Sequence, residues 1–180
     1  MIKRVLFVIL FSGLFAPTFA QNTNNQFKVG FDAVAVLNEY YKTQFPAGFG
    51  LSFKGLMAMP NEAQLTFSGN YLYFPLNSNY IIPKGENISL HQIPVFIGYR
   101  VYRQSFFFEP QIGASFLINR NKNIVGTNSS KNIQFGFSAE IGYVFNQLEL
   151  SLRYQQSGAA PYQMAILGAR VAYTIAGASY

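Results

Sequence analysis

Eight stretches of this chain, between Phe27 and Ile175, alternate between a hydrophobic residue and a small or polar one. The seventh stretch, from Leu148 to Gln155, shows the pattern best and reads LELSLRYQ. Side chains of a β-strand point alternately to the two faces of a sheet, so each stretch has one apolar and one polar face. In all eight stretches the charged residues share the parity of the small and polar residues. The sequence therefore predicts strands that keep charge away from a hydrophobic surface.

This sidedness predicts an all-β fold, an eight-stranded antiparallel up-and-down transmembrane β-barrel with its apolar faces outward. A Lys or Arg facing lipid at the bilayer midplane costs about 2–4 kcal/mol, and the parity avoids that cost. Only 11% of the residues are charged, against about 25% in soluble domains. The alternative is a soluble lipocalin-like barrel. It would have an apolar interior and a charged exterior, the opposite of the arrangement predicted here.

The connections have an uneven rhythm that supports the barrel. We expect strands near residues 27–36, 45–55, 64–74, 90–102, 105–118, 133–144, 148–155 and 164–175. The connections after the second, fourth and sixth strands are short, at residues 56–63, 103–104 and 145–146. The others are mostly longer, and residues 75–89 and 119–132 are examples. Bacterial barrels have short periplasmic turns and long external loops, so we expect 75–89 and 119–132 to be extracellular loops.

A few residues depart from the alternation. Four hydrophobic residues have the inward parity: Phe96, Phe107, Leu117 and Ile166. Pro94 and Pro110 lie inside adjacent strands, where each removes a hydrogen-bond donor. We therefore expect β-bulges at both prolines.

The N-terminus has the pattern of an export signal. Lys3 and Arg4 precede an apolar run from Val5 to Phe15, and Ala20 ends a cleavage-site pattern. An uncleaved anchor helix is the alternative, but the run is shorter than the roughly 20 residues that span a bilayer. We expect a signal peptide (1–20), a polar leader (21–26), an outer-membrane β-barrel (27–176) and a short C-terminal tail (177–180). The predicted location is the cell outer membrane of a Gram-negative bacterium, and the lack of Cys excludes a lipidated N-terminal cysteine.

Nine charged residues have the inward parity: Lys28, Asp32, Lys54, Arg100, Glu109, Glu140, Glu149, Arg153 and Arg170. An eight-stranded barrel has an interior just wide enough for side chains. Buried charges must be paired or neutralised. We therefore expect a lumen-facing charged network that plugs the barrel. The alternative is a narrow gated conduction path or a proton relay.

Aromatic residues gather toward the strand ends, as in the interfacial girdles of membrane barrels. The predicted interfacial aromatics are Tyr71, Tyr73, Tyr99, Tyr143, Tyr154 and Tyr173. We expect these rings to anchor the barrel in the membrane interface. Stacking on a ligand is the alternative role.

His91 is the only histidine, and Ser89 lies two residues before it. A lipid-A deacylase would need a Ser–His–acid set at this level of a barrel. One Ser beside one His in a Ser-rich loop is common by chance, so we expect a structural role. With one His and no Cys, the sequence predicts no metal site and no cofactor.

Two segments resemble a known family. IPVFIGYR at 93–100 and FFEPQIG at 107–113 look like the central hairpin of small bacterial outer-membrane β-barrel domain proteins. These are described as porin-family or PorT-like, with an eight-stranded OmpX-like barrel. Residues 137–153 and 167–173 are similar to the same family. The family usually ends on an aromatic insertion signal. Tyr180 falls on the inward parity here, so Tyr173 is the alternative.

The expected function is that of an integral outer-membrane protein with a polar, plugged lumen and no enzymatic activity. It would act as a structural or interaction protein through its extracellular loops. Expected partners are outer-membrane lipid and lipopolysaccharide, the barrel-insertion machinery and a protein at the loops. Its basic residues are scattered, so no nucleic-acid partner is expected. The alternatives are a narrow porin-like channel, an accessory subunit of an outer-membrane secretion or transport system, and a lipid-A-modifying enzyme.

Overall fold

The computed structural model describes residues 25–59, 63–80, 87–123 and 126–177. The predicted signal peptide and Tyr180 lie outside these residues. The strands are β1 (Gln26–Val36), β2 (Ala47–Ala58), β3 (Gln64–Pro75), β4 (Asn87–Arg103), β5 (Phe106–Asn123), β6 (Gly126–Phe145), β7 (Leu148–Ser157) and β8 (Met164–Ala176). One short helix, α2 (Glu39–Lys42), lies between β1 and β2. Among the described residues no helix is long and apolar enough to cross a membrane.

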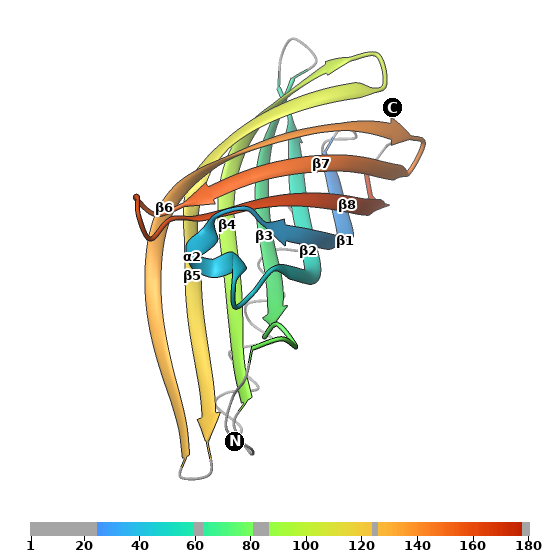
Figure 1. The fold of residues 1–180 in the computed structure, drawn as a ribbon. Helices are drawn as coiled ribbons and strands as arrows, with labels where there is room; N and C mark the ends of the chain where they lie inside the picture. Colours follow the sequence, from blue (N-terminus) through green and yellow to red (C-terminus); the bar gives the residue numbers. More distant parts are fainter. Residues whose placement is uncertain (1–24, 60–62, 81–86, 124–125, 178–180) are drawn as a thin grey trace, which may run out of the picture.

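The strands form one closed sheet in sequence order, and each pairs antiparallel with its neighbours (Figure 1). β8 closes the barrel on β1 through pairs such as Asp32 with Arg170. This confirms the predicted eight-stranded antiparallel up-and-down barrel. The turn end of the barrel holds the start of β1, the end of β8 and the tight turns after β4 and β6. In these turns Gln104 and Asn146 have positive φ angles of 58° and 52°, as short hairpins commonly require. The opposite end is the loop end.

The predicted loop at 119–132 is wrong. β5 and β6 continue as a paired hairpin through this segment, from Leu117 opposite Asn132 to Asn123 opposite Gly126. The hairpin projects at the loop end beyond the level of α2 (Figure 1). Beyond the barrel rim neither face of the hairpin has to be apolar, so the alternation that marks a strand disappears although the backbone pairing continues. β7 joins β6 only from Gly136 onward.

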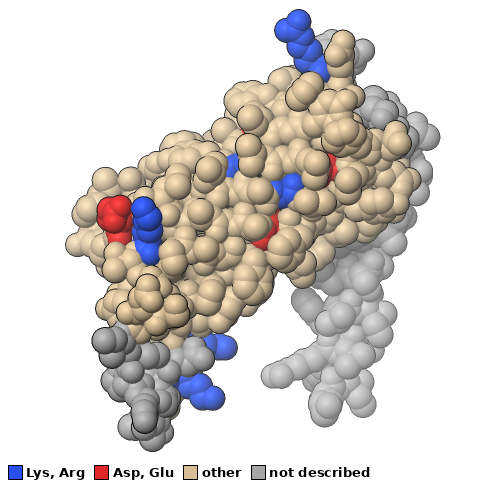
Figure 2. Space-filling model, turned by 45° about the vertical axis from the view of Figure 1, so that its right-hand side comes forward, with Lys and Arg blue, Asp and Glu red and all other residues tan. Residues whose placement is uncertain are grey.

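The outward face of the barrel is apolar. Large hydrophobic side chains stand exposed along every strand, and Phe135 and Ile112 have exposed fractions of 81% and 72%. Charged side chains are sparse on the face in Figure 2. Four of the seven acidic residues in the chain, Asp32, Glu109, Glu140 and Glu149, are buried inside the barrel.

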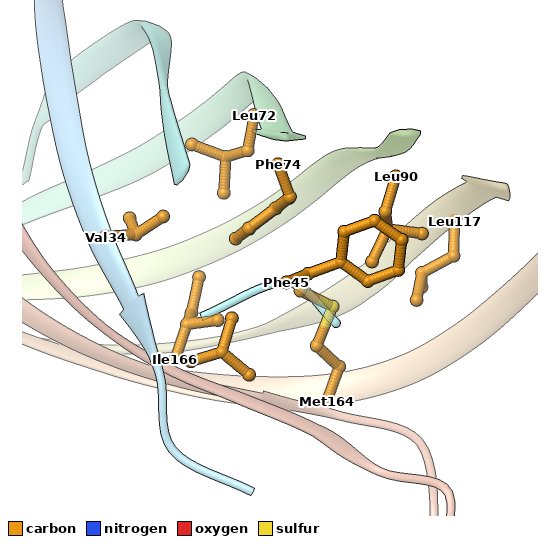
Figure 3. Close-up of a cluster of buried hydrophobic side chains, with 9 residues drawn as sticks. Val34, Phe45, Leu72, Phe74, Leu90, Leu117, Met164 and Ile166 are labelled. Atoms are coloured by element: carbon orange, nitrogen blue, oxygen red, sulfur yellow. The ribbon is translucent and has the colours of Figure 1, made fainter. Parts of the chain in front are cut away.

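Nine hydrophobic side chains fill the interior near the loop end: Val34, Val36, Phe45, Leu72, Phe74, Leu90, Leu117, Met164 and Ile166 (Figure 3). We call them the apolar cluster. Phe45 corrects the predicted start of the second strand, which was expected near residue 45. The strand begins at Ala47, and the Phe45 amide donates to the carbonyl oxygen of Tyr41 at 2.7 Å. That turn after α2 directs the Phe45 side chain into the barrel, where it is 1% exposed.

The predicted bulges at the two prolines are also wrong. Each ladder has a gap beside its proline and then continues in the same register: Gly69 pairs with Val95 and Leu72 with Gln92 around Pro94. Around Pro110 the ladder between β4 and β5 behaves likewise. Because each proline still pairs with the strand on its other side, the missing donor needs no extra residue. The β1–β8 ladder has a register shift, between Phe27 and Lys28.

Close approach of β2 and β3 makes Gly50 sensitive to substitution. A Cβ atom at Gly50 would overlap the carbonyl oxygen of Tyr71, whereas a Cβ at Gly69 would meet open space. We expect Gly50→Ala to lower the free energy of unfolding by about 1–3 kcal/mol, as overpacking does. Gly69→Ala is the matched control and should not lower it. Urea unfolding in detergent micelles measures both, and equal midpoints would contradict the close approach.

Candidate functional site: a charged network inside the barrel

The nine inward charged residues all lie inside the barrel, each no more than 3% exposed. They come from seven of the eight strands, because strand alternation directs one residue in two into the lumen. The structure brings Lys28, Asp32, Lys54, Arg100, Glu109, Glu140, Glu149, Arg153 and Arg170 together through side-chain pairs of 4.0 Å or less. β3 contributes neutral partners to the same network.

Arg100 joins two carboxylates near the turn end. Its Nε donates to Glu109 at 2.6 Å and its Nη1 donates to Glu149 at 2.6 Å. Lys28 reaches the same Glu149 oxygen at 2.7 Å. The Arg100 guanidinium also lies 3.6 Å from the ring centroid of Phe107. Phe107, an exception to the alternation, therefore covers one face of this cation.

Glu140 links two further cations, Lys54 and Arg170. Lys54 lies 2.9 Å from Glu140 and 3.2 Å from Glu109, so it bridges two carboxylates. Arg170 lies 3.2 Å from Glu140 and donates to Asp32 at 2.9 Å. The network thus runs continuously around the lumen wall.

Neutral groups satisfy other carboxylate oxygens. Thr66 donates to Glu109 at 2.7 Å and Ser151 donates to Glu140 at 2.8 Å. Asn70 accepts a hydrogen bond from Arg170 at 2.8 Å. A buried ion pair is stable only when its remaining polar atoms are also bonded. These hydroxyl and amide groups meet much of that requirement.

Arg153 is held more loosely than the other cations. Its side chain is 1% exposed and its Nη2 lies 3.7 Å from Asp32. None of its three guanidinium nitrogens has a hydrogen-bond partner within the described protein. The network contains five cations and four carboxylates, and Arg153 is the cation with the weakest pairing.

Neutral polar side chains lie beside the apolar cluster, where Gln155 pairs with Ile166 and Ser157 with Met164. Ser115 and Ser157 hydroxyls are 2.8 Å apart, and Gln155 donates to Ser115 at 3.3 Å. The lumen is therefore largely charged toward the turn end, and toward the loop end it is apolar with neutral polar groups among the hydrophobic side chains.

The apolar cluster was not predicted from the sequence, although the sequence contains a signal for it. At the loop end of β3, YLYF at 71–74 is hydrophobic on both parities. A strand that is apolar on both faces is typical of burial on both sides. Leu72 and Phe74 are both fully buried in the lumen, with 0% exposure.

The six predicted interfacial tyrosines form two groups by position. Tyr71, Tyr73 and Tyr154 lie in the half of the barrel toward the loop end, and the other three, Tyr99, Tyr143 and Tyr173, lie toward the turn end. All six are partly or largely exposed. Several pack on outward phenylalanines, as Tyr143 does on Phe106 with ring centroids 4.7 Å apart. The Tyr173 hydroxyl donates a hydrogen bond to the side chain of Gln147, in the turn after β6.

His91 lies between two hydroxyl groups on the outward face. Its Nε2 is 3.2 Å from the Ser89 hydroxyl and its Nδ1 is 2.7 Å from the Tyr71 hydroxyl. In a Ser–His–acid triad a carboxylate orients the imidazole. Here Tyr71 occupies that position, and no carboxylate of the described residues bonds to His91. The described part of the chain also contains no group of His, Cys, Asp and Glu that could hold a metal ion.

Comparison with solved structures identifies the fold. Ail, the attachment invasion locus protein of Yersinia pestis, superposes with a TM-score of 0.61 and 11% identity. The match covers 84% of this chain and 97% of Ail. The chain has the fold of the small outer-membrane β-barrels. This confirms the resemblance predicted from the sequence, at the level of fold.

Two further structures support the same fold. Neisserial surface protein A, NspA, matches with a TM-score of 0.57 and 17% identity over 83% of this chain and 97% of NspA. The N-terminal β-barrel domain of Pseudomonas aeruginosa OprF matches with a TM-score of 0.57 and 10% identity over 86% of this chain and 100% of that domain. No protein-family model and no curated protein sequence matches this chain, so the PorT-like resemblance stays a prediction.

Removing one carboxylate should test the network. Glu149→Gln leaves Lys28 without its paired charge and Arg100 with Glu109 alone, and we expect a loss of about 3–5 kcal/mol in unfolding free energy. The control is Glu39→Gln, the same chemical change at an exposed residue 3.7 Å from Lys42. We expect it to leave the urea midpoint unchanged, because exposed pairs contribute little. Similar midpoints for both variants would contradict the role assigned to Glu149.

Proposed function

We propose that this protein is an integral barrel of a bacterial outer membrane, with a closed lumen and no enzymatic activity, that acts as a structural or interaction protein. The observation that supports this proposal most directly is the difference between the two faces of the barrel wall. Outward side chains such as Phe135 and Ile112 are hydrophobic and largely exposed, while nine charged side chains are buried and interlinked. In water this arrangement would expose a hydrophobic band around the molecule, whereas lipid would cover it. We further propose that residues 1–20 are the export signal.

The orientation follows from the two ends. The tight turns, the start of β1 and the end of β8 lie at the turn end, which corresponds to the periplasmic side of bacterial barrels. The loop end then faces outward from the cell, with α2, residues 76–80 and the β5–β6 hairpin. The two groups of tyrosines would lie at the two membrane interfaces.

Two features of the loop end support an interaction role. β6 from Asn128 to Gln134 pairs with β5 alone among the described strands, so one edge of its backbone has no strand partner there. Exposed strand edges are common sites of protein association. Ail carries "attachment" in its name and has been solved with the heparin analogue sucrose octasulfate. A protein partner at the loop end of this chain is part of the proposal.

Cysteine labelling tests the orientation, because the chain contains no native Cys. We expect Ser129→Cys, on the β5–β6 hairpin, to react on intact cells with a maleimide too large for general porins. Gln147→Cys, in the turn after β6, should react only after the outer membrane is permeabilised. The reverse pattern would invert the proposed orientation. Labelling of both sites in a freely soluble, non-heat-modifiable protein would refute membrane insertion.

Planar-bilayer recording tests the closed lumen. The ion-pair network and the apolar cluster together fill the interior, so we expect no steady conductance from the heat-modifiable, folded protein. Ions crossing the apolar cluster would have to lose hydration without compensation. A steady conductance that Arg100→Gln or Glu109→Gln changes would instead identify a narrow channel.

A further inference from the structure

The outward faces of β5 and β6 change chemistry at one place on each strand. On β5 the outward parity passes from Phe116 and Ile118 to two cations, Arg120 and Lys122. On β6 it passes from Phe135 and Ile133 to Lys131. In both strands the cations follow directly after the apolar column, toward the loop end.

Strand pairing places these cations side by side. Ile118 pairs with Lys131 and Arg120 pairs with Ser129, so Arg120 and Lys131 are diagonal neighbours. Diagonal neighbours lie about 7–8 Å apart, and Lys122 follows Arg120 on the same face at about 7 Å. All three side chains are exposed. We call Arg120, Lys122 and Lys131 the cationic face.

Arg120 is flanked by small side chains on both neighbouring strands, Ser89 on β4 and Ser129 on β6. Neither is large enough to cover a guanidinium group. The Arg120 donors are therefore accessible from the outward side. A planar guanidinium can bind a phosphate through two parallel hydrogen bonds.

The described part of the chain supplies no counter-charge for the cationic face. Four of its carboxylates, Asp32, Glu109, Glu140 and Glu149, are buried in the lumen network. The fifth, Glu39, pairs with Lys42 on α2. Three like charges on adjacent positions repel one another, and an external anion would relieve that repulsion.

We propose that the cationic face binds the phosphate groups of a phosphorylated glycolipid of the outer leaflet, the lipopolysaccharide class. This inference rests on the proposed membrane location and orientation, and it specifies a lipid partner. In a membrane the apolar column from Ile112 to Ile118 contacts acyl chains, and Arg120 follows at the level of the headgroups. Lys and Arg reach such anionic groups with their charged ends while their alkyl stems cover apolar surface. A soluble polyanion would not require the cations to continue the lipid-facing column.

The test compares lipid binding by folded protein in zwitterionic detergent. The probes are bisphosphorylated lipid A and the same lipid without phosphates. The test variant is Arg120→Gln/Lys122→Gln/Lys131→Gln, and the control is Lys42→Gln/Arg103→Gln, which removes exposed cations elsewhere on the surface. Since each cation near an anionic surface contributes about 1 kcal/mol, we expect the triple variant to bind bisphosphorylated lipid A about 100-fold more weakly. The control should bind like the wild type, and added salt should reduce the difference.

The outcomes separate this inference from the proposed function. Heat modifiability of every variant reports whether the barrel forms, independently of lipid A binding. Equal affinity of the wild type and the triple variant, or equal binding of lipid A with and without phosphates, would overturn the phosphate site. A triple variant that loses only binding to a soluble sulfated oligosaccharide would assign the cationic face to a soluble polyanion and overturn the glycolipid.

Discussion

The cost of a charge in hydrocarbon is the constraint on which the rest of this structure depends. A barrel with lipid outside must turn its charged side chains inward, and an eight-stranded barrel has room only for side chains there. Inside, an unpaired charge is also costly, so carboxylates and cations must meet in bonded pairs. The links among Arg100, Glu109 and Glu149 satisfy this requirement at distances of 2.6 Å. Sidedness and pairing are thus two consequences of one desolvation cost.

The same constraint shapes the two ends of the lumen differently. Toward the turn end the interior is charged, and toward the loop end it is closed by Phe45, Phe74 and the rest of the apolar cluster. A hydrophobic layer needs no hydrogen-bond partners, so it can seal a mouth whose loops come from distant parts of the chain. In the charged part of the lumen the pairing is incomplete. A network of five cations and four carboxylates leaves the Arg153 guanidinium weakly paired.

Beyond the barrel rim the constraint no longer applies, and the chemistry of β5 and β6 changes. Polar residues occupy both faces of the projecting hairpin, while the backbone pairing continues to Asn123 and Gly126. This is the part of the chain that carries the free strand edge and the cationic face. The wall below it is uniform and apolar. The features that can distinguish one partner from another therefore lie on the loop end.

The sequence by itself determined the eight strands, the closed antiparallel barrel and the parity of its charged residues, because alternation is a local property of the chain. It also marked the four hydrophobic exceptions, and the structure places Phe96 and Phe107 inside the lumen at 1% and 4% exposure. Only the tertiary structure decided which carboxylate meets which cation, since Lys28 and Glu149 are 121 residues apart in the chain. It also decided that Phe45 turns inward, that the prolines keep their register and that residues 119–132 belong to strands. Each of these depends on a neighbouring strand or turn, and contacts between distant segments leave no periodic trace in a single sequence.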